Sequence, residues 1–284
     1  MAVCYFQHAL ELDPVSEACQ RWRDREFSWQ IERYGVFRPE RYSVEPLDRS
    51  TAKEFVVRHH YSGSYVVARR EYGLYDHLDP AKPRLAGVAT LSMPTSPASL
   101  TNVFPALDVG EQSIVLGRFV LLDDVPSNGE TWTLAEVFRQ AAAEGVRGVL
   151  AYSDPVVRVA ADGRVVFPGH RGLIYRAANA NYLGRTKRRP MTLLPDGSAL
   201  PERSLQKIRS GERGARHVEE RLIAAGATPR GPDQSRRQWT DQALTEVGAC
   251  MLDHHGQHKF AWAIGPRAQR SRVRIGVTAV PFFA

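Results

Sequence analysis

The pattern of hydrophobic and polar positions predicts strands and helices in alternation from Tyr42 onward. Alternating or continuously apolar runs indicate strands, whereas apolar positions three and four residues apart indicate helices. The run 113–122 is apolar on both faces, which predicts a central strand of a sheet. The predicted strands are 42–47, 70–75, 85–93, 113–122, 147–152, 258–264 and 272–280, and the predicted helices are 51–60, 130–144, 171–179 and one or two within 203–225.

The order of these elements combines an antiparallel meander with a strand–helix–strand unit. It predicts a mixed α/β (α+β) fold, in which a central mixed sheet is flanked by helices. This combination occurs in the acyl-CoA N-acyltransferase (GNAT) fold, so we expect a GNAT-like domain. A hairpin is predicted around Asp162 and Gly163, because apolar alternation continues on both sides of this turn dipeptide.

A helical extension is predicted over residues 1–40, ahead of a GNAT-like catalytic domain over 41–284. Asp13 and Ser16 are typical helix-capping residues, and Gly35 is a typical helix stop. The segment between them is rich in aromatic residues, which favours packing against the main domain or against a partner subunit. A homodimer is therefore one arrangement that we expect.

Charge is distributed unevenly along the 284 residues. Lysine and arginine total 38 against 31 aspartate and glutamate, which gives a net charge of +7. The segment 176–237 alone contains 14 basic and 6 acidic residues, a balance of +8 that leaves −1 for the remainder. A basic excess confined to one segment predicts a surface that faces a polyanion.

The composition argues against several classes of protein. Hydrophobic residues make up 43% of the chain, enough for a sizeable core, so disorder is excluded. No apolar run is long enough for a membrane helix, and the start lacks the pattern of a secretory signal. Three cysteines, none in a CxxC pair, argue against a disulfide framework and for a reducing compartment, so we expect a cytoplasmic protein.

Arg118 and the loop after its strand form one candidate site. An arginine in an apolar strand either faces a ligand or is held in an internal ion pair. Asn128, Gly129 and Thr131 lie where the next helix begins, and free amide groups at a helix start attract anions such as the phosphates of a CoA donor. Capping of that helix by Asn128 or Thr131 is the alternative.

Two further groups of candidate site residues lie at the ends of a predicted strand and a predicted helix. Asp154 follows the strand 147–152, and the carboxyl end of a strand suits a general base or a metal ligand. Turn formation before Pro155 is the alternative. His60 and Tyr61 end the first helix of the domain, where they either line the same site or cap the helix.

The densest run of polar and aromatic residues is 169–184, which contains Tyr175. Tyrosine hydroxyls and asparagine amides in such a run can hold a ligand. Four cations follow, and cations beside aromatic residues suit a phosphate backbone and a displaced base. A solvated surface turn is the alternative. The four cations are Arg185, Lys187, Arg188 and Arg189.

In combination these features resemble the Mom family of phage DNA-modification proteins. The resemblance covers residues 42 to 265, and its most specific part is the run 169–184. The resemblance is based on the order and spacing of these motifs along the chain. The matching residues are His60-Tyr61-Ser62, Arg118, Glu130-Thr131, Ser153-Asp154-Pro155, Gly169-His170, Gly172, Tyr175, Ala177, Asn179, Tyr182 and Gly184.

The resemblance implies a transferase that acts on double-stranded DNA in the host cytoplasm. It implies conversion of the exocyclic N6 amine of adenine to a carbamoylmethyl derivative, or a related acyl-type transfer, that blocks restriction enzymes. An acyl-CoA-type donor and iron are the implied cofactors. The implied catalytic residues are Arg118, Tyr61, Thr131, Asp154 and Tyr175, the donor would contact Arg118, Asn128, Gly129 and Thr131, and a metal would contact His60 and Asp154.

The chain departs from the family pattern at two places, and two other functions stay open. The residues 156–168 are an insertion at the rim of the site, and the N-terminal extension has no counterpart in the family. An acyl-CoA-dependent N-acetyltransferase of a small amine or protein would not need the basic segment. A non-catalytic DNA-binding protein on a GNAT-like fold would not need Arg118, Asp154 and Tyr175 to converge.

Overall fold

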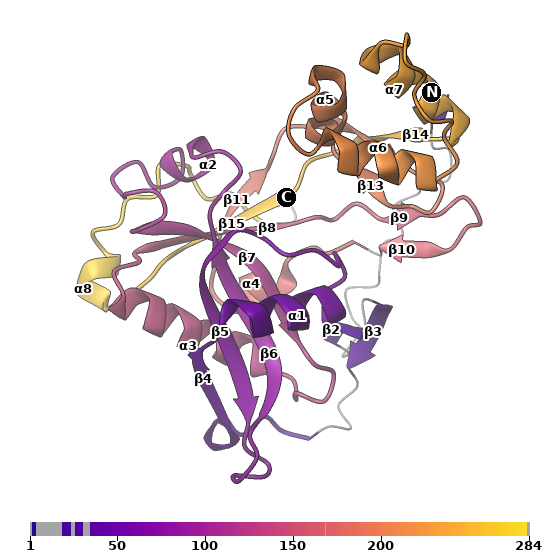
Figure 1. Cartoon of the computed structure of the whole chain (residues 1–284). Helices are drawn as coiled ribbons and strands as arrows, with labels where there is room; N and C mark the ends of the chain where they lie inside the picture. The colour runs from indigo at the N-terminus through magenta and orange to yellow at the C-terminus, as the bar shows by residue number, and fades with distance from the viewer. Residues whose placement is uncertain (1, 4–18, 24–25, 31–34, 168, 283–284) are drawn as a thin grey trace. The chain divides into compact units, whose positions relative to one another are not determined.

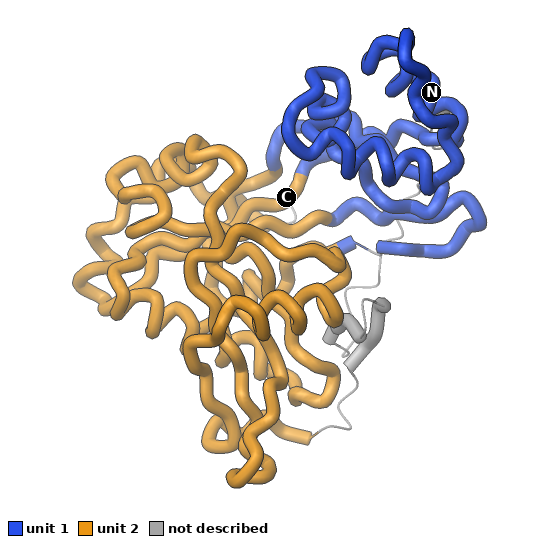
Figure 2. The backbone as a smooth tube through the Cα atoms, viewed as in Figure 1, with its two compact units in different colours: residues 1–11, 155–169, 186–256 blue, residues 12–154, 170–185, 257–284 orange. Residues whose placement is uncertain are grey.

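The computed structural model describes residues 2–3, 19–23, 26–30, 35–167 and 169–282. The chain divides into two compact units (Figure 2). Unit 1 contains residues 1–11, 155–169 and 186–256, and unit 2 contains residues 12–154, 170–185 and 257–284. Unit 1 is therefore built mainly from an insertion between strands of unit 2.

Unit 2 is organised around a seven-stranded sheet in the order β11-β15-β8-β7-β6-β5-β4 (Figure 1). All neighbouring strands are antiparallel except β7 and β8, which are parallel. The predicted mixed α/β fold with a central mixed sheet is thus confirmed, and β7 is the central strand, as its two apolar faces predict. The strands are β4 Tyr42–Pro46, β5 Ala68–Asp76, β6 Arg84–Ser92, β7 Ser113–Leu121, β8 Gly148–Ser153, β11 Asn181–Arg185 and β15 His258–Ala263.

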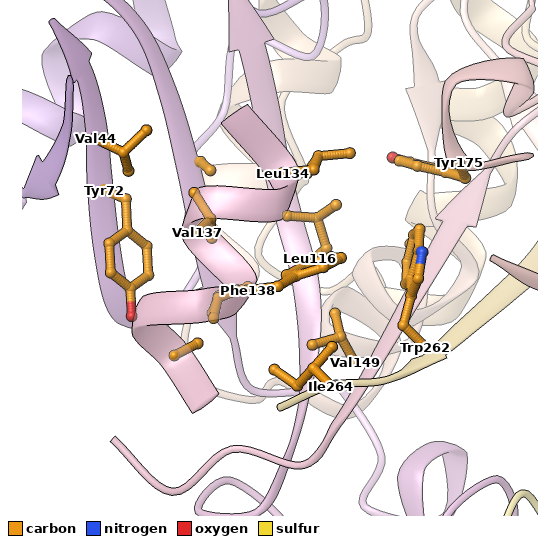
Figure 3. Close-up of a cluster of buried hydrophobic side chains, with 14 of the residues drawn as sticks. Val44, Tyr72, Leu116, Leu134, Val137, Phe138, Val149, Tyr175, Trp262 and Ile264 are labelled. Carbon is orange, nitrogen blue, oxygen red and sulfur yellow. The ribbon is translucent and has the colours of Figure 1, made fainter. Parts of the chain in front are cut away.

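Helices cover both faces of this sheet. α1 packs through Phe55 and Val56 onto Val88 and Val120 of one face. α3 packs on the opposite face, where Leu134, Val137 and other buried residues form the largest apolar cluster (Figure 3). Asp48 caps the start of α1, because its carboxylate accepts a hydrogen bond from the amide of Thr51 at 3.0 Å. The helices of unit 2 are η2 Pro39–Arg41, α1 Arg49–His59, α2 Ala98–Thr101, α3 Gly129–Ala143, α4 Leu173–Ala177 and α8 Arg267–Arg270.

Unit 1 has a core of its own. Leu205, Ile208, Leu222, Trp239 and Leu244 bring its three longer helices together in one buried cluster. The sequence predicts α5 and α6 within 203–225, but it does not predict α7 or the small sheet β1-β14-β12-β13. The elements of unit 1 are β1 Ala2–Val3, β9 Arg158–Val159, β10 Val165–Phe167, β12 Arg189–Leu193, β13 Ala199–Leu200, β14 Cys250–His254, α5 Glu202–Ser210, α6 Ala215–Ala224 and α7 Arg236–Glu246.

Two sequence predictions are wrong in the residues that the structure describes. The N-terminal extension contains an antiparallel hairpin of β2 Cys19–Arg23 and β3 Glu26–Gln30 where a helix was expected. Tryptophan and phenylalanine favour strands, and this preference outweighs the helical spacing. The predicted strand 272–280 is extended but is not paired as a strand. The hairpin predicted around Asp162 is confirmed as β9 and β10.

The structure bears on three further expectations: the domain boundary, the cysteines and the membrane helices. The boundary predicted at residue 40 stays a prediction, because most of the residues before it lie outside the described part of the chain. Cys250 is disulfide-bonded, which the sparse cysteine count does not predict. Within the described residues, no helix is long and apolar enough to cross a membrane.

Candidate active site

The central sheet opens between its two parallel strands. β7 and β8 pair only through residues 113–115 and 148–150, yet β7 continues to Leu121 and β8 to Ser153. Beyond Val115 the two strands therefore have facing edges that are not hydrogen bonded to each other. Ligands of open α/β sheets bind outside the carboxyl ends of parallel strands, so this opening is where we look for the site.

Arg118 lies in the unpaired part of β7, directly after a β-bulge. The pairing of β6 with β7 shifts between Thr90–Arg118 and Leu91–Leu116, which leaves Gly117 as the extra residue. A Cβ atom at Gly117 would lie 2.2 Å from the Oγ of Ser92, so only glycine fits there. A bulge re-aims the following side chain, which explains how an apolar strand presents a guanidinium.

The guanidinium of Arg118 is held by neutral oxygens. Its Nε donates to the carbonyl of Ser64 at 3.0 Å, Nη2 to the Oγ of Ser64 at 3.1 Å, and Nη1 to the carbonyl of Gly117 at 2.7 Å. Burial lowers the pKa of Arg118, and Tyr61 and Tyr175 oppose this shift. No carboxylate of the described chain pairs with Arg118, so the internal ion pair that was its alternative is absent there.

His60 is connected to Arg118 through the turn after α1. The amide of Ser62 donates to Nδ1 of His60 at 3.2 Å, and the Oγ of Ser62 donates to the carbonyl of Ser64 at 3.3 Å. His60 is buried, and burial, Arg118 and His170 hold its pKa well below the ordinary value. Tyr61 stacks on it with ring centroids 4.1 Å apart. His60 is therefore neutral at pH 7.

Tyr175 of α4 is buried against the ends of β15. Its ring contacts Trp262 edge-on at 5.6 Å (Figure 3). It also contacts Phe260 at 5.3 Å and His170 at 5.5 Å, again edge-on. Burial raises the pKa of Tyr175, Tyr61 raises it further, and Arg118 opposes both. The hydroxyl has no hydrogen-bond partner among the described residues. Tyr175 is thus a neutral, protonated donor within the electrostatic reach of Arg118.

Asp154 and His170 lie together at the end of β8. The amide of His170 donates to the carbonyl of Asp154 at 2.6 Å, and the Asp154 side chain is buried. Burial lowers the pKa of His170 to about 4, although the Asp154 carboxylate raises it. The neighbouring Ser153 has a buried Oγ without a hydrogen-bond partner. A Cβ at Gly172 would lie 2.8 Å from that Oγ, so glycine keeps the space beside it open.

His258 joins the same group from β15. It is paired with Ser153 in the sheet, and its Nδ1 lies 2.7 Å from the hydroxyl of Tyr182. Burial, Arg185, His170 and Arg171 lower the pKa of His258 to about 4, and Asp154 opposes them. From the sequence, His258 is predicted only as the start of a strand, and neither Ser64 nor His170 is predicted as a catalytic residue. The pairing that brings His258 to Asp154 is non-local and leaves no local signal.

The buried histidines predict a stability that depends on pH. His170 and His258 have pKa values of about 4 in the folded protein against 6.5 as the reference value, so the unfolded chain binds more protons between these two pH values. The free energy of unfolding should therefore be greatest above about pH 6.5 and fall as the pH falls toward about 4. Thermal melting followed by circular dichroism across this range measures the effect.

The control for this pH dependence is a pair of histidine variants. H258Q should flatten the dependence, whereas H255Q, which changes an exposed histidine, should leave it unchanged. An equal pH dependence in wild type and H258Q would contradict the assignment.

The start of α3 has the features of an anion site. Asn128 adopts a left-handed conformation with φ of 75° and makes no side-chain cap, so the predicted capping by Asn128 is not observed. The hydroxyl of Thr131 donates back to the carbonyl of Asn128 at 3.1 Å. Gly129 is buried, and a Cβ there would lie 2.5 Å from Val125.

The residues predicted to hold iron do not form a metal site. In the described part of the chain, no group of three or more histidine, cysteine, aspartate or glutamate side chains is arranged to bind a metal ion. Nδ1 of His60 is occupied by Ser62, and the residue next to Asp154 in space is His170. We therefore derive no step through a metal.

The four predicted DNA-binding cations fall into two groups. Arg185 belongs to unit 2, and Lys187, Arg188 and Arg189 belong to unit 1. Arg188 forms an ion pair with Asp253 of unit 1, so its charge is partly neutralised. The other three are exposed and have no carboxylate partner among the described residues.

The pKa shifts connect several of the predicted catalytic residues through electrostatic interactions. Arg118 acts on Tyr175 and His60, Tyr61 acts on Tyr175, and His170 connects this group to Asp154. Among the described residues, no contact joins Thr131 or Asn128 to this group. Their role at the site therefore stays a prediction.

Comparisons with known proteins give a family and one similar fold. No curated protein matches the chain. A solved structure described as a tandem GNAT protein from the clavulanic acid biosynthesis pathway, without AcCoA, is similar at 12% identity and a TM-score of 0.34, over 78% of this chain and 70% of that chain. The model of the Mom protein family matches residues 41–237, which is more than half of the sequence. The chain therefore belongs to the Mom family of DNA-modification proteins.

Proposed function

We propose that this protein is a transferase that modifies the exocyclic N6 amine of adenine in double-stranded DNA, by carbamoylmethylation or a related acyl-type transfer. One observation carries the proposal. Arg118, Tyr61, Tyr175 and His60 influence one another at the opening between β7 and β8, and His170 connects them to Asp154. A binding protein without activity has no need for such a group.

Asp154 is the proposed general base. The N6 amine of adenine is a weak nucleophile because its lone pair is delocalised into the ring. The carboxylate of Asp154 would take a proton from N6 as nitrogen forms its bond to the transferred carbon. The neighbouring His170 has a low pKa and is neutral at pH 7, so it does not compete as the proton carrier.

Tyr175 and Arg118 have complementary roles in the proposal. The raised pKa of Tyr175 keeps its hydroxyl protonated, so it would give its proton to the departing group of the donor. Arg118 is bound only by neutral oxygens in the described chain, which leaves its positive charge available for an anionic donor. The turn from His60 to Ser64 holds that guanidinium in place.

In an acyl-type transfer, an acyl-CoA-type donor would supply the acyl group, whose carbonyl carbon bonds to N6 as the CoA thiolate leaves. Carbamoylmethylation would instead need a donor whose leaving group is on the methylene carbon. The start of α3 suits the phosphates of such a donor, since the Asn128 side chain does not cap the helix. Gly129 and Thr131 belong to the first turn of that helix. These three residues and Arg118 are the proposed donor contacts.

The substrate amine lies inside the DNA duplex, so the adenine must leave the base stack. Flipping a base costs a few kcal/mol, which contacts with the phosphate backbone offset. Arg185, Lys187 and Arg189 are exposed cations that would make such contacts. The ion-paired Arg188 would contribute less. The homodimer suggested by the N-terminal aromatic residues is a separate proposal.

The test of this function is the nucleoside composition of DNA from cells that produce the protein. DNA from expressing bacteria is digested to nucleosides and analysed by mass spectrometry. We expect a new nucleoside derived from deoxyadenosine, with the added mass of a carbamoylmethyl group. A modified nucleoside of another base would overturn the adenine assignment. Unchanged nucleosides, with folded protein that binds acetyl-CoA, would favour an ordinary N-acetyltransferase.

A further inference from the structure

The segment after β15 forms an extended strap along unit 2. It follows α8 and returns past α2 toward the end of the sheet formed by β11 and β15 (Figure 1). The amide of Gly276 donates to the carbonyl of Val103 at 2.8 Å, and the amide of Val280 donates to the carbonyl of Tyr182 at 2.9 Å. The strap, residues 271–282, lies beyond the residues that match the family model.

The apolar residues of the strap fix its backbone. Val273, Ile275 and Val277 pack against the buried cluster that contains Phe104 and Leu150. A Cβ at Gly276 would lie 2.9 Å from the carbonyl oxygen of Asn102, so the chain approaches the α2 region closely there. At its end, the ring of Phe282 packs on Tyr182 and His258 at 4.8 and 5.7 Å. The strap is therefore anchored along its length.

Two of the residues that alternate with this apolar set, Arg272 and Arg274, are arginines. Arg272 and Arg274 are exposed, and so are Arg267 and Arg270 of the preceding helix α8. The sequence contains no aspartate or glutamate after Asp253. None of the four guanidinium groups pairs with a carboxylate of the described residues. Most other exposed cations discussed above belong to the segment 176–237, so this is a second basic surface.

We propose that Arg272 and Arg274 of the strap, together with Arg267 and Arg270 of α8, bind the phosphate backbone of duplex DNA. The apolar anchoring orders the backbone in advance, so little further chain entropy is lost on binding. Arg272 and Arg274 are two residues apart in extended chain, about 6.6 Å at 3.3 Å per residue, which allows each to contact a separate phosphate. Four unpaired cations without a neighbouring acidic residue in the sequence suit a polyanion and carry no base specificity. The choice of DNA as the partner rests on the proposed function. The inference that these arginines bind a polyanion does not depend on it.

The test is the salt dependence of DNA binding by the full chain. Each phosphate contact contributes a slope of about −0.9 to the dependence of log affinity on log salt concentration. At 0.1 M salt, one contact therefore raises the affinity about eightfold relative to 1 M salt. Fluorescence anisotropy with a labelled duplex of fixed sequence would measure both quantities. We expect R272Q/R274Q to bind roughly sixtyfold more weakly at 0.1 M salt and to lose a slope of about 1.8.

Two control variants keep the result interpretable. R69Q/R139Q removes two exposed arginines of unit 2 that are already ion-paired with Glu111 and Glu136, and it should change the slope much less. R272K/R274K keeps the charges and should bind like wild type. Melting temperatures of all variants would check that the apolar anchoring is intact.

The outcomes separate this proposal from the proposed function. An unchanged slope in R272Q/R274Q would overturn the strap as a DNA surface, even if the protein modifies DNA. A reduced slope would support it, even if no modified nucleoside is found. A loss of binding to single-stranded RNA or to anionic vesicles, with duplex binding unchanged, would assign the strap to another partner and would also overturn the proposal.

Discussion

Replacing Asp154 with asparagine should abolish the modified nucleoside while leaving the protein folded. The substitution keeps the size and most of the hydrogen-bonding capacity of the side chain but removes the proton acceptor. General base catalysis contributes about 10²- to 10⁴-fold, so modification should fall by at least about a hundredfold. Nucleoside mass spectrometry of DNA from cells expressing equal amounts of wild type and D154N measures the loss.

The matched control for D154N is another buried aspartate of unit 2. Asp76 accepts hydrogen bonds from Arg41 at 2.5 and 2.6 Å and from Arg84 at 3.2 Å, and these contacts lower its pKa. D76N should therefore lower the melting temperature and leave modification per folded molecule unchanged. D154N should instead keep the melting temperature and lose the modification activity. Full modification by folded D154N would contradict the base assignment.

Replacing Tyr175 with phenylalanine should lower activity strongly without loss of stability. The ring contacts with Phe260 and Trp262 are kept, and the removed hydroxyl has no partner in the described part of the chain. If the hydroxyl gives a proton to the leaving group, modification should fall by about 10²-fold or more. The measurements are the rate of nucleoside formation on purified DNA and the midpoint of thermal unfolding.

Tyr72 provides the matched control for Y175F, because both tyrosines belong to the same apolar cluster (Figure 3). The hydroxyl of Tyr72 donates to Glu144 at 3.2 Å, so Y72F should cost about 0.5–1.5 kcal/mol of stability. It should not change activity. Equal activity of Y175F and Y72F would remove Tyr175 from the mechanism, whatever their stabilities.

Several features of the fold could be predicted from local sequence because local chemistry produces them. The carboxylate of Asp48 caps α1 by accepting a hydrogen bond from the amide of Thr51. The two residues are only three positions apart in the sequence, so they are also close in space. β7 is apolar on both faces, and both faces must be shielded from water by other elements. A central position in the sheet provides this burial. The turn dipeptide at Asp162 and Gly163 forms a hairpin for the same local reason.

Other features depend on contacts between residues that are distant in sequence. The hairpin at residues 19–30 could not be separated from a helix, since its aromatic spacing fits both. The helices of unit 1 gather around Trp239, which no periodicity in one helix predicts. The segment 272–280 has the alternation of a strand, but its partner is a packed surface and not another strand edge. Alternation shows that one face is buried, and it does not show what covers that face.

For the site, the chemical groups can be identified from the sequence: Arg118 in an apolar strand, Asp154 after a strand and Tyr175 in a dense polar run. Their arrangement depends on the tertiary structure. The separation of β7 from β8 after Val115 opens the sheet, and the bulge at Gly117 re-aims Arg118. The pairing of β15 with β8 brings His258 to the same end. Strand pairing and register are long-range, so local pattern could propose the residues, and only the folded sheet could bring them together.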